Sequence, residues 1–202
     1  MSCCRFVEES QILTSSGDAT CILWDVESED QISRFRGHES DVMSVSPSPT
    51  EPNIFVTGSC DANACVFDKR VASPVQTFGE TMDAHESDIN AVKFLRNGNA
   101  FVTGSDDCTC RLFDLRAYAE LSCFSEPSII CGVTSVDVSR SGRILFAGYD
   151  NSDCIAWDML YWNKNGTTRL GAHENKVSCL EVDPSGAALC TGSWDALLRV
   201  WC

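Results

Sequence analysis

The sequence lacks any stretch of about 18 uncharged apolar residues, and basic residues are scarce. Its 202 residues include 15 Lys and Arg against 29 Asp and Glu, a formal net charge of −14. This charge repels a phosphate backbone, so we expect no nucleic acid partner. The missing apolar run argues against a membrane span, and the start MSCCRFVEES has no signal-peptide pattern. Neither Ser2 nor Cys202 fits a lipidation motif, so we expect membrane attachment only through partner proteins.

Motifs for catalysis and metal binding are also missing. The sequence has no Gly-rich phosphate loop and no serine nucleophile elbow. Cys3-Cys4 and Cys108-x-Cys110 do not have zinc-site spacing, and Asp106-Asp107 is explained more simply as a solvated turn than as a cation site. We therefore expect no catalytic residue, no metal and no cofactor.

The thirteen cysteines are an odd number, which does not suit a framework of disulfides. Most lie in alternating apolar runs, for example Cys21, Cys65, Cys110 and Cys190. We interpret them as buried thiols in a reducing compartment, and we expect a cytoplasmic protein.

An internal repeat fills the chain. Aromatic residues recur at intervals of 43, 46, 44 and 44 residues, namely Trp24, Phe67, Phe113, Trp157 and Trp201. About six residues before each aromatic lies a turn residue, in order Asp18, Asp61, Asp107, Asn151 and Asp195. A β-like run precedes each turn, and units of this length with four short strands form propeller blades. The sequence therefore predicts an all-β propeller arrangement of about five repeats, approximately 1–36, 37–80, 81–124, 125–170 and 171–202.

A histidine signal opens three of the repeats, at Gly37-His38, Ala84-His85 and Ala172-His173. Because strand directions alternate, each histidine and the turn acid of its repeat should lie on one rim. We predict hydrogen bonds in three pairs, His38 with Asp61, His85 with Asp107 and His173 with Asp195. A strand hydroxyl such as Thr57 or Thr191 should lie beside the pair, and the repeat aromatics should complete a structural network with it, among them Trp24, Trp157 and Trp201.

The fourth repeat has SEPSIICGVTSV where the histidine would stand, and Asn151 in its turn. We expect it to be the least firmly held blade.

Particular stretches resemble heterotrimeric G protein beta subunits over essentially the whole chain. They include TSSGDATCILWD, GNAFVTGSDDCTCRLFDLRA, SIICGVTSV and CTGSWD. The resemblance implies a carboxy-terminal portion with about five of the family's seven blades, a last blade without its outer strand, and no helix for pairing with a gamma subunit. We interpret the chain as a fragment, an incomplete gene model or a truncated isoform.

The resemblance also implies a partner-binding rim, since the family binds its alpha subunit and effectors at the histidine-bearing rim. The matching positions are Asp41, Met43, Cys60, Asp88, Asn90, Asp106 and Trp194, with Lys176 and Asp150 as weaker candidates. The residues alone leave Asp41 and Asp88 open between partner contact and capping of the turns behind His38 and His85. For Trp194 an outward indole is favoured, because its neighbours belong to a tight turn.

The function implied by the resemblance is a non-enzymatic signalling subunit that transduces receptor signals. It would bind a GDP-loaded alpha subunit, pair with a gamma subunit, regulate effectors, and lie peripherally at the inner face of the plasma membrane through lipidated partners. The alternative is a generic WD-repeat interaction scaffold. A propeller enzyme would need a cluster of titratable groups in a deep pocket, which the repeat-bound acids do not suggest.

Overall fold

The fold is all-β in the computed structural model, which describes residues 1–79, 84–164, 166–171 and 173–202. Strands form five antiparallel sheets, which we call blades one to five in chain order. Helical structure in these ranges is the single 3₁₀ turn η1 (Trp162–Lys164). None of the helical structure described is therefore long and apolar enough to cross a membrane.

Blades one to four have four strands each, and blade five has three. Blade one contains β1 (Cys3–Glu8), β2 (Gln11–Ser15), β3 (Thr20–Asp25) and β4 (Gln31–Arg36). Blade two contains β5 (Val42–Pro47), β6 (Ile54–Ser59), β7 (Ala64–Asp68) and β8 (Pro74–Phe78). Blade three contains β9 (Ile89–Phe94), β10 (Ala100–Ser105), β11 (Cys110–Asp114) and β12 (Ala119–Phe124). Blade four contains β13 (Val133–Val138), β14 (Ile144–Tyr149), β15 (Cys154–Asp158) and β16 (Thr167–Arg169). Blade five contains β17 (Val177–Val182), β18 (Leu189–Ser193) and β19 (Leu198–Trp201).

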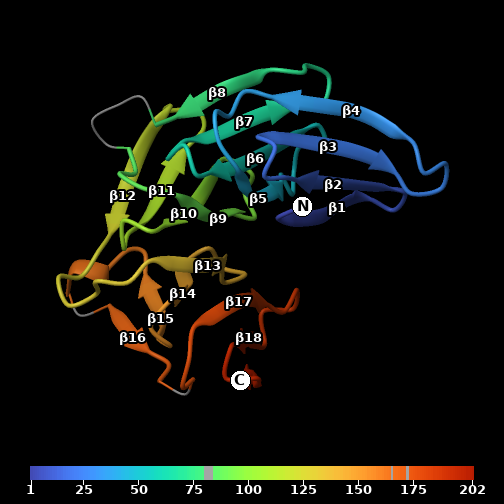
Figure 1. The fold of residues 1–202 in the computed structure, drawn as a ribbon. Helices are drawn as coiled ribbons and strands as arrows, with labels where there is room; N and C mark the ends of the chain where they lie inside the picture. The colour runs from blue at the N-terminus through green and yellow to red at the C-terminus, as the bar shows by residue number, and fades with distance from the viewer. Residues whose placement is uncertain (80–83, 165, 172) are drawn as a thin grey trace.

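The five blades follow one another around an arc (Figure 1). The first strand of each blade is the innermost, and β1, β5, β9, β13 and β17 contact one another in that order. The blades predicted from the repeat are confirmed, and so is the last blade with one strand fewer, which the family resemblance implies. Each sheet lies within one predicted repeat. The repeat boundaries themselves stay a prediction, and the one at residues 80 and 81 falls at the edge of a segment outside the described residues.

In blades one to three, an aromatic side chain of the outer strand joins the blade to the next one. Phe35 on β4 packs on Phe55 and Phe67 of blade two, with ring centroids 4.9 and 5.9 Å apart. Phe78 on β8 packs in the same way on Phe101 and Phe113 of blade three, at 5.2 and 5.3 Å. Edge-on and tilted ring contacts of this kind add to the free energy of apolar burial. The periodic aromatics therefore hold neighbouring blades together as well as filling their own blade.

The cysteines follow the prediction in three of the four positions named for burial. Cys21, Cys65 and Cys110 are buried, and all thirteen cysteines are free thiols. The prediction for Cys190 is wrong, because this residue is exposed on β18. Side chains alternate along β18, so Cys190 lies on the face opposite the buried Leu189 and Thr191.

Truncation of Phe78 should destabilise the fold strongly. We expect Phe78→Ala to lower the free energy of unfolding by about 3–5 kcal/mol, because a buried ring is lost between two blades and a cavity remains. The matched control is Val75→Ala on the same strand, where the side chain is 49% exposed and the loss should stay below about 0.5 kcal/mol. Urea denaturation of both variants measures the difference, and equal losses would contradict the role given to Phe78.

Candidate partner-binding rim

The loop histidine of blade two is held at both ring nitrogens. His38 Nδ1 lies 2.8 Å from Asp61 Oδ2, and Nε2 lies 2.7 Å from Thr57 Oγ1. The Thr57 hydroxyl donates to the carbonyl of Cys65 at 3.2 Å, so its oxygen accepts from Nε2. Both ring nitrogens then donate, which is the pattern of an imidazolium. Burial opposes protonation most strongly, but the hydrogen bond to Asp61, the contact with Cys65 and the negative charge of Asp61 together outweigh it and raise the pKa of His38 to about 9.

The same arrangement recurs in blades three and five. His85 Nδ1 lies 2.7 Å from Asp107, and His173 Nδ1 lies 2.8 Å from Asp195. Each Nε2 contacts a strand threonine, Thr103 in blade three and Thr191 in blade five. The residue after each histidine also donates its backbone N–H to the same turn acid, from Glu39, Glu86 and Glu174 respectively. The turn acid therefore holds both the ring and the backbone of the loop.

The repeat tryptophans occupy two different environments. Trp24 donates its indole N–H to Thr14 at 2.9 Å, and Trp201 donates to Thr191 at 3.1 Å, which joins Trp201 to the histidine network. Trp157, which we grouped with these residues, is a buried core residue of blade four instead. Its indole nitrogen has no hydrogen-bond partner within the described ranges.

Blade four has no loop histidine, and buried aromatic side chains fill its interior. Tyr149 is fully buried and belongs to the same apolar cluster as Trp157 and Ile129. Burial raises the pKa of the Tyr149 hydroxyl far above its usual range, so this group stays neutral. The turn residue Asn151 bonds locally to Asp153, at 3.0 Å, rather than to a loop histidine.

Each network places two candidate partner-binding positions side by side. The backbone N–H of Cys60 donates to the carbonyl of Asp41, and that of Asp106 donates to the carbonyl of Asp88, both at 2.9 Å. In blade five the N–H of Trp194 donates to the carbonyl of Lys176 at 3.0 Å. One member of each pair comes from the loop after the histidine and the other from the turn. We call this end of the blades the acidic rim, defined by Asp41, Asp88, Asp106 and Asp150.

Side chains of the rim also connect neighbouring residues and blades. Asn90 donates to Asp106 at 2.6 Å and to the carbonyl of Val133 in blade four at 2.9 Å. Lys176 of blade five pairs with Asp150 of blade four at 2.8 Å, and its ammonium lies 5.5 Å from the centre of the Trp194 ring. The resemblance marks Lys176 and Asp150 as weaker candidates, and the structure connects Lys176 both to Asp150 and to Trp194.

Cys60 of blade two lies near Asp88 of blade three. Burial and the hydrogen bond with Asp88 raise the pKa of the Cys60 thiol to about 12, so the thiol stays protonated. At this position the rim offers a neutral, half-buried sulfur beside a carboxylate.

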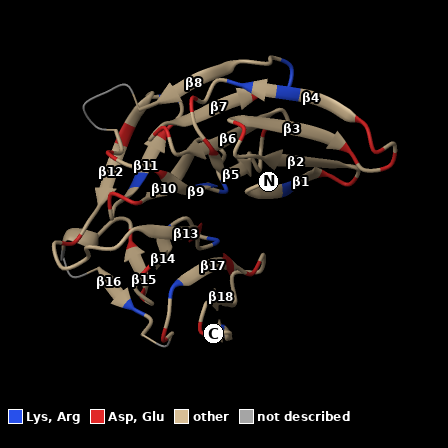
Figure 2. Ribbon diagram, in the orientation of Figure 1, with Lys and Arg blue, Asp and Glu red and all other residues tan. Residues whose placement is uncertain are grey.

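The rim residues differ in exposure. The Trp194 side chain is 69% exposed, as an outward indole should be. Asp41 and Asp106 are exposed, while Met43, Cys60, Asp88 and Asn90 are half-buried. Asp61 and Asp107 hold the first backbone N–H after His38 and His85, so Asp41 and Asp88 are not the groups that cap those loops there. Figure 2 shows acidic residues mostly in the loops and turns at strand ends. Within the described residues no group of three or more His, Cys, Asp or Glu could hold a metal ion.

Comparisons with known proteins point to one family. A family model described as G protein beta WD-40 repeat protein matches residues 1–202. The chain is 46% identical over 213 residues to a guanine nucleotide-binding protein subunit beta of Solanum tuberosum. Proteins of the same description from Oryza sativa subsp. japonica and Zea mays are 46% and 45% identical over 215 residues. In each case the alignment covers 100% of this chain and 56% of the relative, so the chain spans little more than half the length of these proteins.

The stability of blade two should fall as pH rises through 9. His38 has its pKa raised from 6.5 to about 9, so its contribution is complete below pH 6.5 and is lost as the folded-state imidazolium deprotonates. The pKa of Asp61 is lowered, so this carboxylate stays ionised over the whole range. We expect the free energy of unfolding to lose roughly 3 kcal/mol between pH 6.5 and 9.5 from His38 alone.

The control for this titration is His38→Gln, measured by urea denaturation at the same pH values. The wild-type and variant stabilities should converge toward pH 9.5, since groups other than His38 affect both proteins alike. Parallel curves would show that His38 is not charged in the folded protein.

Proposed function

The chain belongs to the G protein beta family of WD40 repeat proteins, and we propose that it is a non-enzymatic signalling subunit whose acidic rim binds a G protein alpha subunit. The family relationship supports a G-beta-like signalling role. The finer proposal is that the rim takes up a GDP-loaded alpha subunit and competing effectors in turn. The observation that carries it is the exposed Trp194 indole at one end of a row of carboxylates.

The chemistry of the rim suits a protein partner with basic side chains. An exposed indole supplies a large apolar contact, and tryptophan is enriched among residues that dominate interface energies. Asp41, Asp88 and Asp106 favour cationic groups and disfavour acidic ones. Met43 and Cys60 are half-buried beside them and add softer apolar contact. Because the network behind the rim holds these residues in place, little conformational entropy is lost on binding.

Further partners belong to the same proposal. We propose that the protein acts as part of a dimer with a gamma subunit and reaches the inner face of the plasma membrane through lipidated partners. The chain spans 56% of its relatives, so these partners are tested with the chain alone and with a gamma subunit added. Capture of purified GDP-loaded alpha subunit on the immobilised chain would support the proposal. No capture in either format would favour a generic WD-repeat interaction scaffold.

Removal of the exposed indole should weaken alpha-subunit binding without loss of the fold. We expect Trp194→Ala to cost roughly 2–4 kcal/mol of binding free energy, mainly through a faster dissociation rate. The control is Leu121→Ala on the outer strand β12, a side chain that is 53% exposed away from the rim. Surface plasmon resonance and thermal denaturation of both variants separate the outcomes. Equal affinity for the two variants would remove Trp194 from the binding site.

Replacement of Asp88 should act through electrostatics. We expect Asp88→Ala to cost about 1 kcal/mol of binding free energy at low salt, with the loss shrinking as ionic strength rises. A structural role would instead lower the melting temperature and leave the salt dependence of affinity unchanged. Affinity titrations at several salt concentrations, together with a thermal scan, decide between the two roles.

A further inference from the structure

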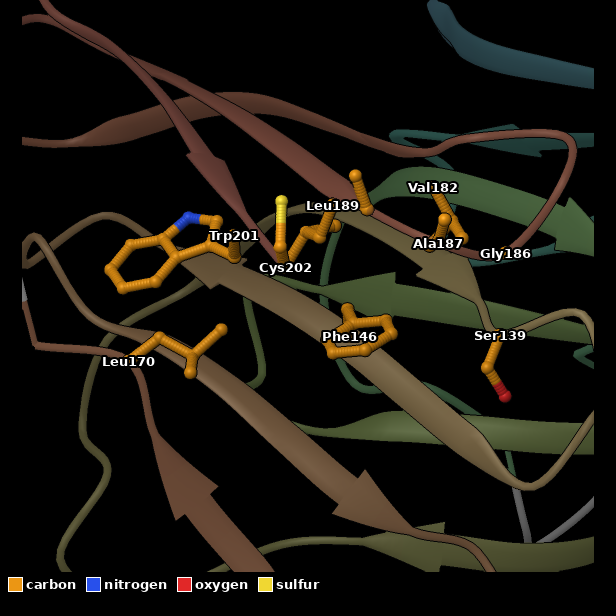
Figure 3. Close-up of a pocket in the computed structure, with 10 residues that line it drawn as sticks. Ser139, Phe146, Leu170, Val182, Gly186, Ala187, Leu189, Trp201 and Cys202 are labelled. Carbon is orange, nitrogen blue, oxygen red and sulfur yellow. The ribbon is translucent and has the colours of Figure 1, made fainter.

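Blade five, which carries Trp194 and Lys176, is the blade with the least apolar support. Leu170 takes the place at the junction of blades four and five that Phe35 and Phe78 fill at earlier junctions. The buried cluster at this junction is small, comprising Cys154, Leu180 and Leu189. A cavity of about 250 Å³ lies beside it, and Figure 3 shows Leu170, Phe146 and Trp201 around this space. Apolar packing is therefore looser at this junction than at the junctions filled by Phe35 and Phe78, although Val177 of β17 is buried next to Gly148 of blade four.

Polar side chains of blade four contact the inner edge of blade five instead. β17 is an edge strand, so its inward backbone groups have no strand partner. Near one end, the N–H of Val182 donates to Asp137 Oδ2 at 2.8 Å. Near the other end, the Thr134 hydroxyl donates to the carbonyl of Val177. These two contacts connect β13 to both ends of β17.

Asp137 is a buried carboxylate that joins three blades. Its exposed fraction is 3%. Oδ1 lies 3.1 Å from Nζ of Lys93 in blade three and accepts from the N–H of Val138 in blade four at 2.7 Å. Oδ2 accepts from Val182 in blade five. Removing such a carboxylate leaves three donors without their acceptor, so its loss should be felt at Val182.

The residue equivalent to Asp137 in blade two makes the same kind of contact. Ser46 occupies the equivalent place on β5, and its hydroxyl accepts the N–H of Phe94 on β9 at 3.1 Å. In both cases a side-chain oxygen on the first strand of one blade accepts a backbone N–H of the first strand of the next blade. In blade two the acceptor is a neutral hydroxyl at a junction rich in aromatics. Between blades four and five it is a carboxylate at a junction that contains a cavity.

We propose that Asp137 is a positioning residue for the part of the acidic rim next to Trp194. It holds β17 in place, and β17 in turn fixes the positions of Lys176 and Trp194. β17 begins directly after Lys176, whose carbonyl accepts the N–H of Trp194 at 3.0 Å. The Lys176 ammonium lies 5.5 Å from the Trp194 ring centre. A shift of β17 therefore moves the backbone and the cation that hold the indole. The proposal rests on the proposed function for its effect on binding, but its structural part can be tested without a partner.

The structural test uses the chain labelled with 5-fluorotryptophan and observed by ¹⁹F NMR. The Trp194 resonance is assigned with Trp194→Phe, and exchange of the Val182 amide is followed by hydrogen exchange. Asp137→Ala should shift or broaden the Trp194 resonance and speed Val182 exchange about tenfold or more. Asp137→Ser, which copies the acceptor found in blade two, should restore much of both. Ser46→Ala, the matched control, should leave the Trp194 resonance unchanged.

The binding test measures affinity for GDP-loaded alpha subunit with the same variants. Asp137→Ala should weaken binding about 2- to 30-fold, and Ser46→Ala should weaken it less than twofold. An unchanged Trp194 resonance together with unchanged Val182 exchange in Asp137→Ala would overturn the proposal. If Asp137→Ala does not fold, Thr134→Val removes the other contact with almost no change of shape, and an unmoved Trp194 resonance there overturns it. Failure of the wild type to bind the alpha subunit would reject the proposed function, and the NMR and exchange results would still decide the role of Asp137.

Discussion

The hydrogen bond between a loop histidine and a turn aspartate is the interaction on which the acidic rim depends. It joins the segment that enters a blade to the turn between that blade's second and third strands, as His38 and Asp61 show. Both segments carry candidate partner-binding residues, so the pair that stabilises the blade also fixes the spacing of Asp41 and Cys60. A charged hydrogen bond shielded from water is stronger than an exposed one. The fold therefore presents a rim that is ordered before any partner arrives.

Blade four shows what replaces this interaction when it is absent. Tyr149 and Trp157 fill the blade with buried rings, which gives volume but no directional bond between loop and turn. Blade four also shares a buried apolar cluster with blade three and has polar contacts with Asn90 of blade three and Lys176 of blade five. The expectation that blade four is the least firmly held stays a prediction, because the histidine network is absent there but the largest buried apolar cluster lies in and beside this blade.

The sequence predicts the structure within each repeat but does not predict the contacts between neighbouring blades. The blades and the His–Asp pairs follow from fixed spacings within a unit, because strand alternation decides which ends meet. The contact between Lys93 and Asp137 depends on how far one blade is rotated against the next, and no spacing in the sequence records that rotation. The prediction for Cys190 is wrong for a related reason. The alternating pattern around Cys190 fits a strand that is covered on both faces, but the face of β18 that carries Cys190 is exposed.

The two ends of the blades differ in how their carboxylates are paired. At the opposite end of the blades, Asp68, Asp114 and Asp158 pair with Arg70, Arg116 and Arg143. These carboxylates are largely covered while their arginines are exposed. In blade one the same end also carries Glu27, Glu29 and Asp30, which are exposed. In the part of the chain that the structure describes, no Lys or Arg forms an ion pair with Asp41, Asp88 or Asp106. The fourth rim carboxylate, Asp150, pairs with Lys176. Under the proposed function, the three carboxylates without an ion pair would favour the approach of a basic partner to the rim.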